Sequence, residues 1–158
     1  KLNKLPRKKL TIRLTPQNQS NKQKEKKRWL DFDSSLRIDS GSTDIRHLIS
    51  RSRLVVHSYD STGLLETLSL NIPTLAFWQN DLDHLHEYVK PYYQDLIDVG
   101  VIHLDTESIT NKINEIWDDV DSWWYQTDVQ NAIKKFCKKF AKNCPSPSKK
   151  MASLLKNS

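Results

Sequence analysis

The chain has 158 residues, of which 37% are hydrophobic and 28% are charged. This composition is ordinary for a soluble globular protein, and the length is sufficient for one domain with its own core. The sequence contains neither a signal-peptide core nor an apolar run near the roughly eighteen residues that a membrane-spanning helix needs. Because it also begins with Lys1 rather than Met, we expect a fragment of a cytoplasmic protein.

The formal net charge of +6 is distributed unevenly along the chain. Residues 1–28 hold 11 Lys or Arg and one acid, residues 134–158 hold eight Lys and no acid, and the residues between hold 6 basic and 18 acidic side chains. Basic ends can contact an anionic membrane or nucleic acid, or they can be solvated helix faces and frayed termini. Few aromatic residues accompany these charges, which disfavours nucleic acid. Peripheral contact with the inner face of an anionic membrane stays open.

The first third of the chain predicts short strands and polar helices. Residues 9–14 and 36–38 have the pattern of strands, and residues 24–31 and 44–50 have that of helices. Residues 17–27 lack both an apolar period and glycine, so we expect a mobile loop that runs into the first of these helices.

Residues 52–78 predict a strand, a polar loop, a helix and a second strand. Residues 54–56 and 73–77 are short apolar runs of the kind that is buried on both faces of a parallel sheet. Between them, three leucines form one helical stripe: Leu64, Leu65 and Leu68. Ser61 or Thr62 can cap this helix, whose free N–H groups would point into the crevice at the carboxyl ends of the strands. We expect an anion to bind there.

The rest of the chain continues the alternation. Residues 83–99 predict a helix that Pro91 must kink or split, and residues 101–104 predict a fifth strand. Two more helices are expected at 106–117 and 128–142.

Strands that alternate with helices predict an α/β fold, here a Rossmann-like parallel sheet of about five strands with helices on both faces. We expect this domain to span residues 1–143. From Cys144 onward Pro, Ser and Lys dominate, so residues 144–158 are expected to form a flexible basic tail.

Polar residues gather in the loop before the central helix. Hydroxyls and backbone N–H groups at a helix N-terminus bind anionic oxygens without burying a full positive charge. The residues that we expect to hold a diphosphate are Ser58, Tyr59, Ser61, Thr62 and Gly63. This loop is not a Walker loop, because no Gly-x-x-x-x-Gly-Lys is present, and a capped helix without a ligand is the alternative.

Three further residues are candidates for the same site. Glu66 lies one turn into the helix, where its carboxylate can accept hydrogen bonds from ribose hydroxyls or be an acid favoured by the helix macrodipole. Arg13 ends the first strand and can clamp a phosphate or pair with Asp31 or Asp39. His57 terminates the third strand, where it can donate to a phosphate, act as an acid or have a structural role only.

Other clusters predict no chemistry. His84 and His86 would face different ways on a helix, so we predict no metal site. Ser61 lacks the glycine of a nucleophile elbow, which argues against a serine hydrolase. Cys137 and Cys144 lack metal-ligand spacing and are expected to be reduced thiols.

Three tryptophans near the C-terminal end indicate packing against the sheet or against a neighbouring domain that the chain lacks. They are Trp117, Trp123 and Trp124. Because adjacent helical residues point in different directions, we expect Trp123 and Trp124 to be unequally exposed.

The pattern Leu65-Glu66-x-Leu68-x-x-x-x-Pro73 resembles the donor-binding half of GT-B glycosyltransferases. Many members of that superfamily have Gly where this chain has Asn71, and Asn tolerates the left-handed conformation better than any other residue except Gly. A closer resemblance covers roughly residues 53–141 and is to a family of bacterial transferases in surface-carbohydrate synthesis. It rests on residues 55–78, on Pro91-Tyr92-Tyr93 with residues 100–103, and on residues 116–124.

This resemblance implies the C-terminal, donor-nucleotide half of a GT-B-like transferase, which moves a sugar or sugar-phosphate unit onto a surface polysaccharide or glycolipid precursor. The N-terminal half, which binds the acceptor and usually supplies the catalytic base, is then absent, so the catalytic residues are unknown. A nucleotide-activated sugar is the implied donor substrate, with no other cofactor. The alternative is a non-catalytic Rossmann-like module whose basic ends bind nucleic acid, a membrane surface or a protein partner.

Overall fold

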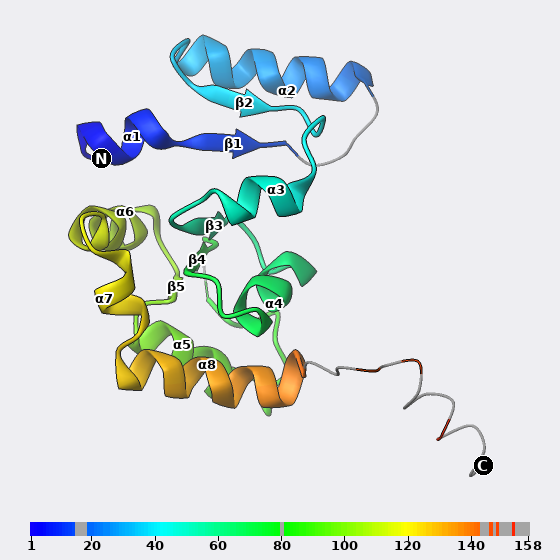
Figure 1. Cartoon of the computed structure of the whole chain (residues 1–158), viewed down its shortest axis with the longest axis vertical. Helices are drawn as coiled ribbons and strands as arrows, with labels where there is room; N and C mark the ends of the chain where they lie inside the picture. The colour runs from blue at the N-terminus through cyan, green and yellow to red at the C-terminus, as the bar shows by residue number, and fades with distance from the viewer. Residues whose placement is uncertain (15–18, 80, 143–145, 147, 149–152, 154–158) are drawn as a thin grey trace.

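The computed structural model describes residues 1–14, 19–79 and 81–142, together with residues 146, 148 and 153 (Figure 1). Most of the predicted tail at 144–158 therefore lies outside the described residues. In chain order the elements are α1 (Lys4–Lys9), β1 (Thr11–Arg13), α2 (Gln19–Phe32), β2 (Arg37–Asp39), α3 (Ile45–Ser50), β3 (Val55–His57), α4 (Thr62–Ser69), β4 (Thr74–Phe77), α5 (Lys90–Asp98), β5 (Ile102–His103), α6 (Thr106–Ile116), α7 (Val120–Trp124) and α8 (Thr127–Phe140). None of these helices is long and apolar enough to cross a membrane.

The described strands form two separate parallel sheets (Figure 1). β1 pairs with β2, and β3, β4 and β5 pair in that order. The mixed α/β class and the parallel pairing are confirmed, but the prediction of a single five-stranded Rossmann-like sheet is wrong for this part of the chain. The physical reason is a shortage of apolar residues: before Arg53, Pro6 and Leu14 are the only buried apolar side chains among the described residues. A parallel sheet needs apolar side chains on both faces.

The hydrophobic core surrounds the three-stranded sheet. Helices α4 and α5 pack on one face of this sheet, with α8 against both of them, and α6 packs on β4 and β5 (Figure 1). Because the side chain of His57 contacts α4, that of Val56 points to the opposite face of β3. Val56 is 39% exposed. Helices therefore lie on both faces of the sheet at β4 and β5, as predicted, whereas the face of β3 that carries Val56 is partly open to solvent.

Two predicted helix boundaries are corrected. Residues 19–27, expected in a loop, belong to α2, because Gln, Lys, Glu and Arg favour a helix without any apolar period. Residues 83–89, expected in a helix, form turns, and α5 begins at Lys90 with Pro91 in its first turn. Proline is well tolerated there, because the first helical N–H groups have no partner within the helix.

The tryptophans of α7 complete the core of the chain itself. Trp123 is 5% exposed and Trp124 is fully buried, so the expectation of unequal exposure is wrong. Trp124 Nε1 donates to the backbone oxygen and to Oδ1 of Asn71, at 3.2 and 3.1 Å. Trp123 Nε1 donates to the backbone oxygen of Val99 at 3.4 Å. These two side chains therefore do not require a neighbouring domain.

Helix α8 runs antiparallel to both α4 and α5. Near its start, Gln130 Nε2 donates to Asn71, which lies just beyond the end of α4. In its middle, Lys135 bonds to Asp95 of α5. At its end, the ring of Phe140 lies 5.2 Å from that of Tyr92, near the start of α5. The last turn of α8 is therefore near the starts of α4 and α5, at the carboxyl edge of the three-stranded sheet.

We predict that alanine at position 71 lowers the stability of the protein more than glycine does, because the backbone of Asn71 is left-handed, with φ of 53°. Asn71→Gly and Asn71→Ala both remove the Oδ1 acceptor, but only alanine strains the left-handed backbone, so Asn71→Ala should be less stable by about 1–2 kcal/mol. Urea unfolding of both variants measures the difference. Asn111, exposed within α6, is the matched control. At position 111 the alanine variant should be more stable than the glycine variant by about 1 kcal/mol. If alanine were the more stable replacement at position 71 as well, the proposed backbone strain at Asn71 would be contradicted.

Candidate functional site

The loop between β3 and α4 lies at the carboxyl edge of the three-stranded sheet and is open to solvent. Ser58, Tyr59, Thr62 and Glu66 are exposed, while Ser61 and Gly63 are half-buried. The structure thus places the five residues predicted to bind a diphosphate next to one another, with Glu66 one turn further along α4. Openness of this loop is what a ligand site requires.

The N-terminus of α4 has no side-chain cap. Ser61 occupies the N-cap position with extended backbone, φ −142° and ψ 162°, but its hydroxyl makes no capping hydrogen bond. The N–H of Leu64 donates to the backbone oxygen of Ser61 at 3.0 Å. The N–H groups of Thr62 and Gly63 have no acceptor among the described residues. These two donors can therefore bind an external anion.

The imidazole of His57 packs beneath this first turn. A Cβ on Gly63 would lie 3.1 Å from His57 Cε1, so glycine allows the close approach of the ring. Nε2 of His57 is 3.1 Å from the hydroxyl oxygen of Thr67, which is itself 3.1 Å from the backbone oxygens of Gly63 and Leu64. The single hydroxyl proton serves a carbonyl, so Nε2 carries a proton and donates to Thr67. Nδ1 then carries a lone pair beside α4, for which the described residues supply no donor.

The charge of His57 depends on two opposing effects. Burial lowers the pKa of the imidazole, and the negative charge of Glu66 raises it, with burial the larger effect. His57 is therefore neutral at neutral pH in the absence of a ligand. An anion bound at the first turn of α4 would favour the protonated ring, whose Nδ1–H would become a further donor.

Asp60 of the loop is bonded to α5. The hydroxyl of Tyr93 donates to both carboxylate oxygens of Asp60, at 3.2 and 3.1 Å, and His84 Nε2 lies 3.9 Å from Oδ2. Burial, and then the charge of Asp60, raise the pKa of the Tyr93 hydroxyl, which keeps it a proton donor. The carboxylate of Asp60 therefore has a partner of its own within the chain.

Trp78 adds a buried donor next to this contact. Its ring lies edge-on to His84 and Tyr93, with centroid distances of 6.1 and 6.2 Å. The indole Nε1 is buried and has no hydrogen-bond partner within the described part of the chain. An unpaired buried N–H costs stability, and a polar group of a ligand that reached Nε1 would remove this cost.

Arg13 lies apart from the loop, in the two-stranded sheet. Its Nη1 forms an ion pair with Asp39 Oδ2 and donates to the backbone oxygen of Thr43 at 2.5 Å. Pairing with Asp39 is the alternative role for Arg13 that the sequence indicates. Its role as a phosphate clamp stays a prediction, without support from this arrangement.

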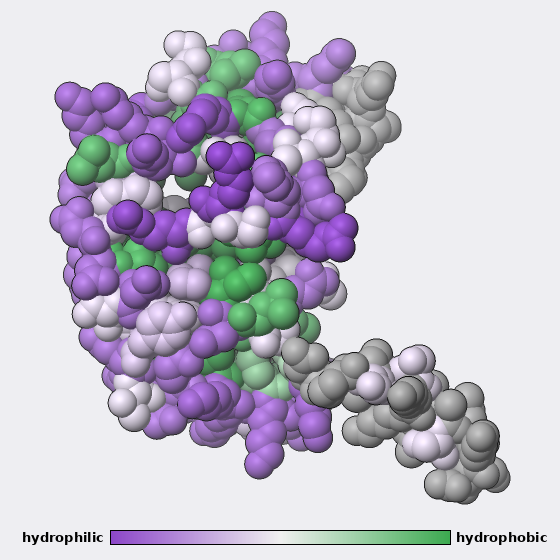
Figure 2. All heavy atoms as spheres, in the orientation of Figure 1, coloured by the Kyte–Doolittle hydropathy of each residue, from purple (hydrophilic) through white to green (hydrophobic). Residues whose placement is uncertain are grey.

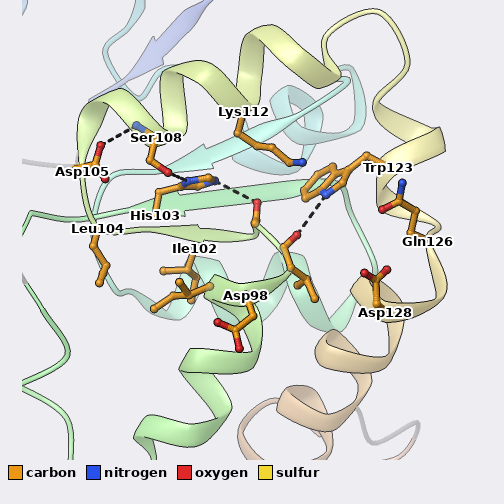
Figure 3. Close-up of a pocket in the computed structure, with 13 residues that line it drawn as sticks. Asp98, Ile102, His103, Leu104, Asp105, Ser108, Lys112, Trp123, Gln126 and Asp128 are labelled. Carbon is orange, nitrogen blue, oxygen red and sulfur yellow. Dashed lines mark hydrogen bonds between the residues drawn. The ribbon is translucent and has the colours of Figure 1, made fainter.

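A cavity of about 430 Å³ lies elsewhere, along the open edge of β5 (Figure 3). His103 lines it and is saturated: Nε2 donates to the backbone oxygen of Gly100 at 3.1 Å, so Nδ1 accepts from the hydroxyl of Ser108 at 2.6 Å. Lys112 points over the ring of Trp123, with 5.2 Å to its centroid (Figure 3). It also pairs with Glu115. Because these groups satisfy one another, the cavity is a weaker candidate than the loop before α4.

The site depends on three residues that sequence reasoning did not assign to it: Thr67, Tyr93 and His84. Thr67 had a local signal in the sequence, because it is a polar residue beside the leucine stripe of α4. In the structure it is 2% exposed. Tyr93 belongs to the motif Pro91-Tyr92-Tyr93, but its partner is 33 residues away in the sequence. Only the tertiary structure identifies that pair.

We predict that the cost of Gly63→Ala depends on the presence of the His57 ring, which a double-mutant cycle can measure. Gly63→Ala should destabilise the protein by about 1–3 kcal/mol, because the added methyl meets the imidazole. In a His57→Ala background the same change should be neutral or stabilising, since alanine favours a helix over glycine by up to about 1 kcal/mol. Thermal and urea unfolding of the four proteins measure the coupling. An equal cost in both backgrounds would contradict the packing of the ring beneath Gly63.

We predict that stability falls as the pH is lowered through about 6.5, the value for an unperturbed histidine. Burial lowers the pKa of both His57 and His103, so below that pH the unfolded chain binds more protons than the folded one. The free energy of unfolding should therefore be lower at pH 5.5 than at pH 7.5. His103→Gln should reduce this difference more than His47→Gln, a change at an exposed position. Identical slopes for both variants would refute the role of the buried ring.

The described residues contain no group of three or more His, Cys, Asp or Glu side chains that could hold a metal ion.

Comparison with known proteins identifies the family of the chain. No protein of curated function and no solved structure matches the chain significantly. The family model described as LIC12162 family transferase matches residues 1–155. The match covers nearly the whole sequence, and the chain therefore belongs to the LIC12162 family of transferases.

Proposed function

We propose that the chain is the donor-nucleotide-binding half of a GT-B-like glycosyltransferase of surface-polysaccharide biosynthesis. One observation supports this assignment more than any other: the uncapped first turn of α4 presents the N–H groups of Thr62 and Gly63 to an open loop at the carboxyl edge of the sheet. In open α/β sheets, ligands bind at this edge.

The proposed donor is a sugar activated by a nucleoside diphosphate or monophosphate. Its phosphate oxygens would accept hydrogen bonds from these N–H groups and from the hydroxyls of Ser58, Ser61 and Thr62. Glu66, exposed one turn further along α4, would accept hydrogen bonds from the ribose hydroxyls. The same donors would stabilise the negative charge that develops on the leaving phosphate during transfer.

The protonation of His57 would respond to the donor. It is neutral when the site is empty, and an anionic phosphate near Nδ1 would raise its pKa. Donor binding would therefore be accompanied by proton uptake below neutral pH. The acceptor and the catalytic base would come from a second half, as in other GT-B enzymes, so this chain alone should bind the donor weakly and not turn it over.

We predict that Glu66→Gln weakens nucleotide binding by roughly 1–3 kcal/mol, the range for a hydrogen bond to a charged group, while the melting temperature stays nearly unchanged. Calorimetric titration with UDP, CMP, CDP and GDP measures the affinity. Glu107→Gln, a change of an exposed acid in the first turn of α6, is the matched control and should leave the affinity unaltered.

Two results would contradict the proposal in different ways. An affinity unchanged in Glu66→Gln would remove the ribose role of Glu66 alone. A wild-type protein that binds none of the four nucleotides, tested also together with the proposed second half, would overturn the donor site itself.

A further inference from the structure

One face of α8 carries a row of lysines. Lys134, Lys135, Lys138 and Lys139 are exposed, and Lys142 follows just beyond the helix end. The opposite face is buried in the core through Val129, Ala132, Ile133 and Phe136. Figure 2 shows mainly hydrophilic side chains on the outer side of this helix.

These charges are poorly compensated within the chain. From residue 129 to the C-terminus the sequence contains no acid. Among the described residues, Asp95 pairs with Lys135, while Lys134, Lys138 and Lys139 have no carboxylate partner. Lysines four residues apart repel one another, as in the pairs 134–138 and 135–139. The helix macrodipole offsets only part of this cost, so the face is suited to an anionic partner.

The C-terminal end of α8 lies near the donor loop, the connection between β3 and α4 at residues 58–61. The ring of Phe140 is 6.4 Å from that of Tyr93, whose hydroxyl bonds to Asp60 in the loop. The neighbouring acids Asp83 and Glu87 are both paired with Lys90, which reduces their repulsion of an anionic surface.

The basic N-terminal helices differ in position. In that region Arg7 pairs with Asp33, and Glu25 and Asp31 interrupt the lysines of α2. Figure 1 places α1 and α2 at the opposite end of the molecule from α8. The N-terminal charge is therefore distant from α8.

We propose that the lysine face of α8 docks the protein on an anionic lipid bilayer, with the donor loop beside the membrane. The two phenylalanines between these lysines, Phe136 and Phe140, are not exposed, and α8 has no arginine. A face of lysines without exposed aromatics or arginines favours dispersed lipid headgroups over nucleic acid, which proteins usually bind with stacking aromatics and bidentate arginines. In this orientation a lipid-linked acceptor at the bilayer surface lies close to the donor site. The docking itself does not depend on which nucleotide the site binds.

Sedimentation with vesicles tests the docking. Wild-type protein should bind phosphatidylcholine vesicles that contain about a third phosphatidylglycerol, and not vesicles of phosphatidylcholine alone, at roughly 0.1 M salt. The triple variant Lys134→Gln, Lys138→Gln, Lys139→Gln should partition about a hundredfold less, because each lysine near an anionic surface contributes roughly a factor of five. Melting curves check that the variant is folded.

The matched control is the triple variant Lys4→Gln, Lys8→Gln, Lys9→Gln in α1, which removes the same charge and should bind within about twofold of wild type. Equal losses in both triple variants would show an effect of net charge only and overturn the proposal. So would absence of binding to anionic vesicles. Binding of single-stranded RNA that depends on the α8 lysines, with vesicle binding unaffected by them, would also overturn it. No nucleotide is present, so any of these results leaves the donor proposal standing.

Discussion

The arrangement of the candidate site depends on the burial of one tyrosine. Tyr93 is 6% exposed, and its ring lies 5.1 Å from Phe136 and 6.2 Å from Trp78. A phenol buried to this extent needs a partner for its hydroxyl, and Asp60 supplies the acceptor. The same side chain therefore joins α8 through its ring and the β3–α4 loop through its oxygen. The packing of α8 against α5 thus buries the ring whose hydroxyl bonds to Asp60.

This constraint explains how one edge of the sheet combines groups of opposite charge. The carboxylate of Asp60 is turned toward α5, and the first turn of α4 keeps its N–H groups free for an anion. His57 lies beneath that turn, neutral when no ligand is bound. The lysine end of α8 lies on the same side, because α8 runs antiparallel to α4 and α5. The C-terminal end of α8 and the donor loop are thus brought near each other by one helix packing.

Local sequence patterns predicted the secondary structure of single segments, but not the contacts between distant segments. The unit from β3 to β4 follows from two apolar runs and a leucine stripe, and Asn71 has the left-handed backbone expected of a Gly-like position. The division into two sheets depends on how much apolar surface distant segments can share, which no local period encodes. The hydrogen bonds of Tyr93 to Asp60 and of Trp124 to Asn71 join residues 33 and 53 positions apart. Such contacts require the tertiary structure.

The central claim, that the first turn of α4 binds the phosphates of a nucleotide donor, is tested most directly by the backbone amide resonances of the ¹⁵N-labelled protein. Addition of a binding nucleotide should shift the signals of Thr62 and Gly63 most strongly, with smaller changes along residues 58–66. Shifts centred on the β5-edge cavity, at residues such as His103 and Lys112, with Thr62 and Gly63 unchanged, would contradict the account.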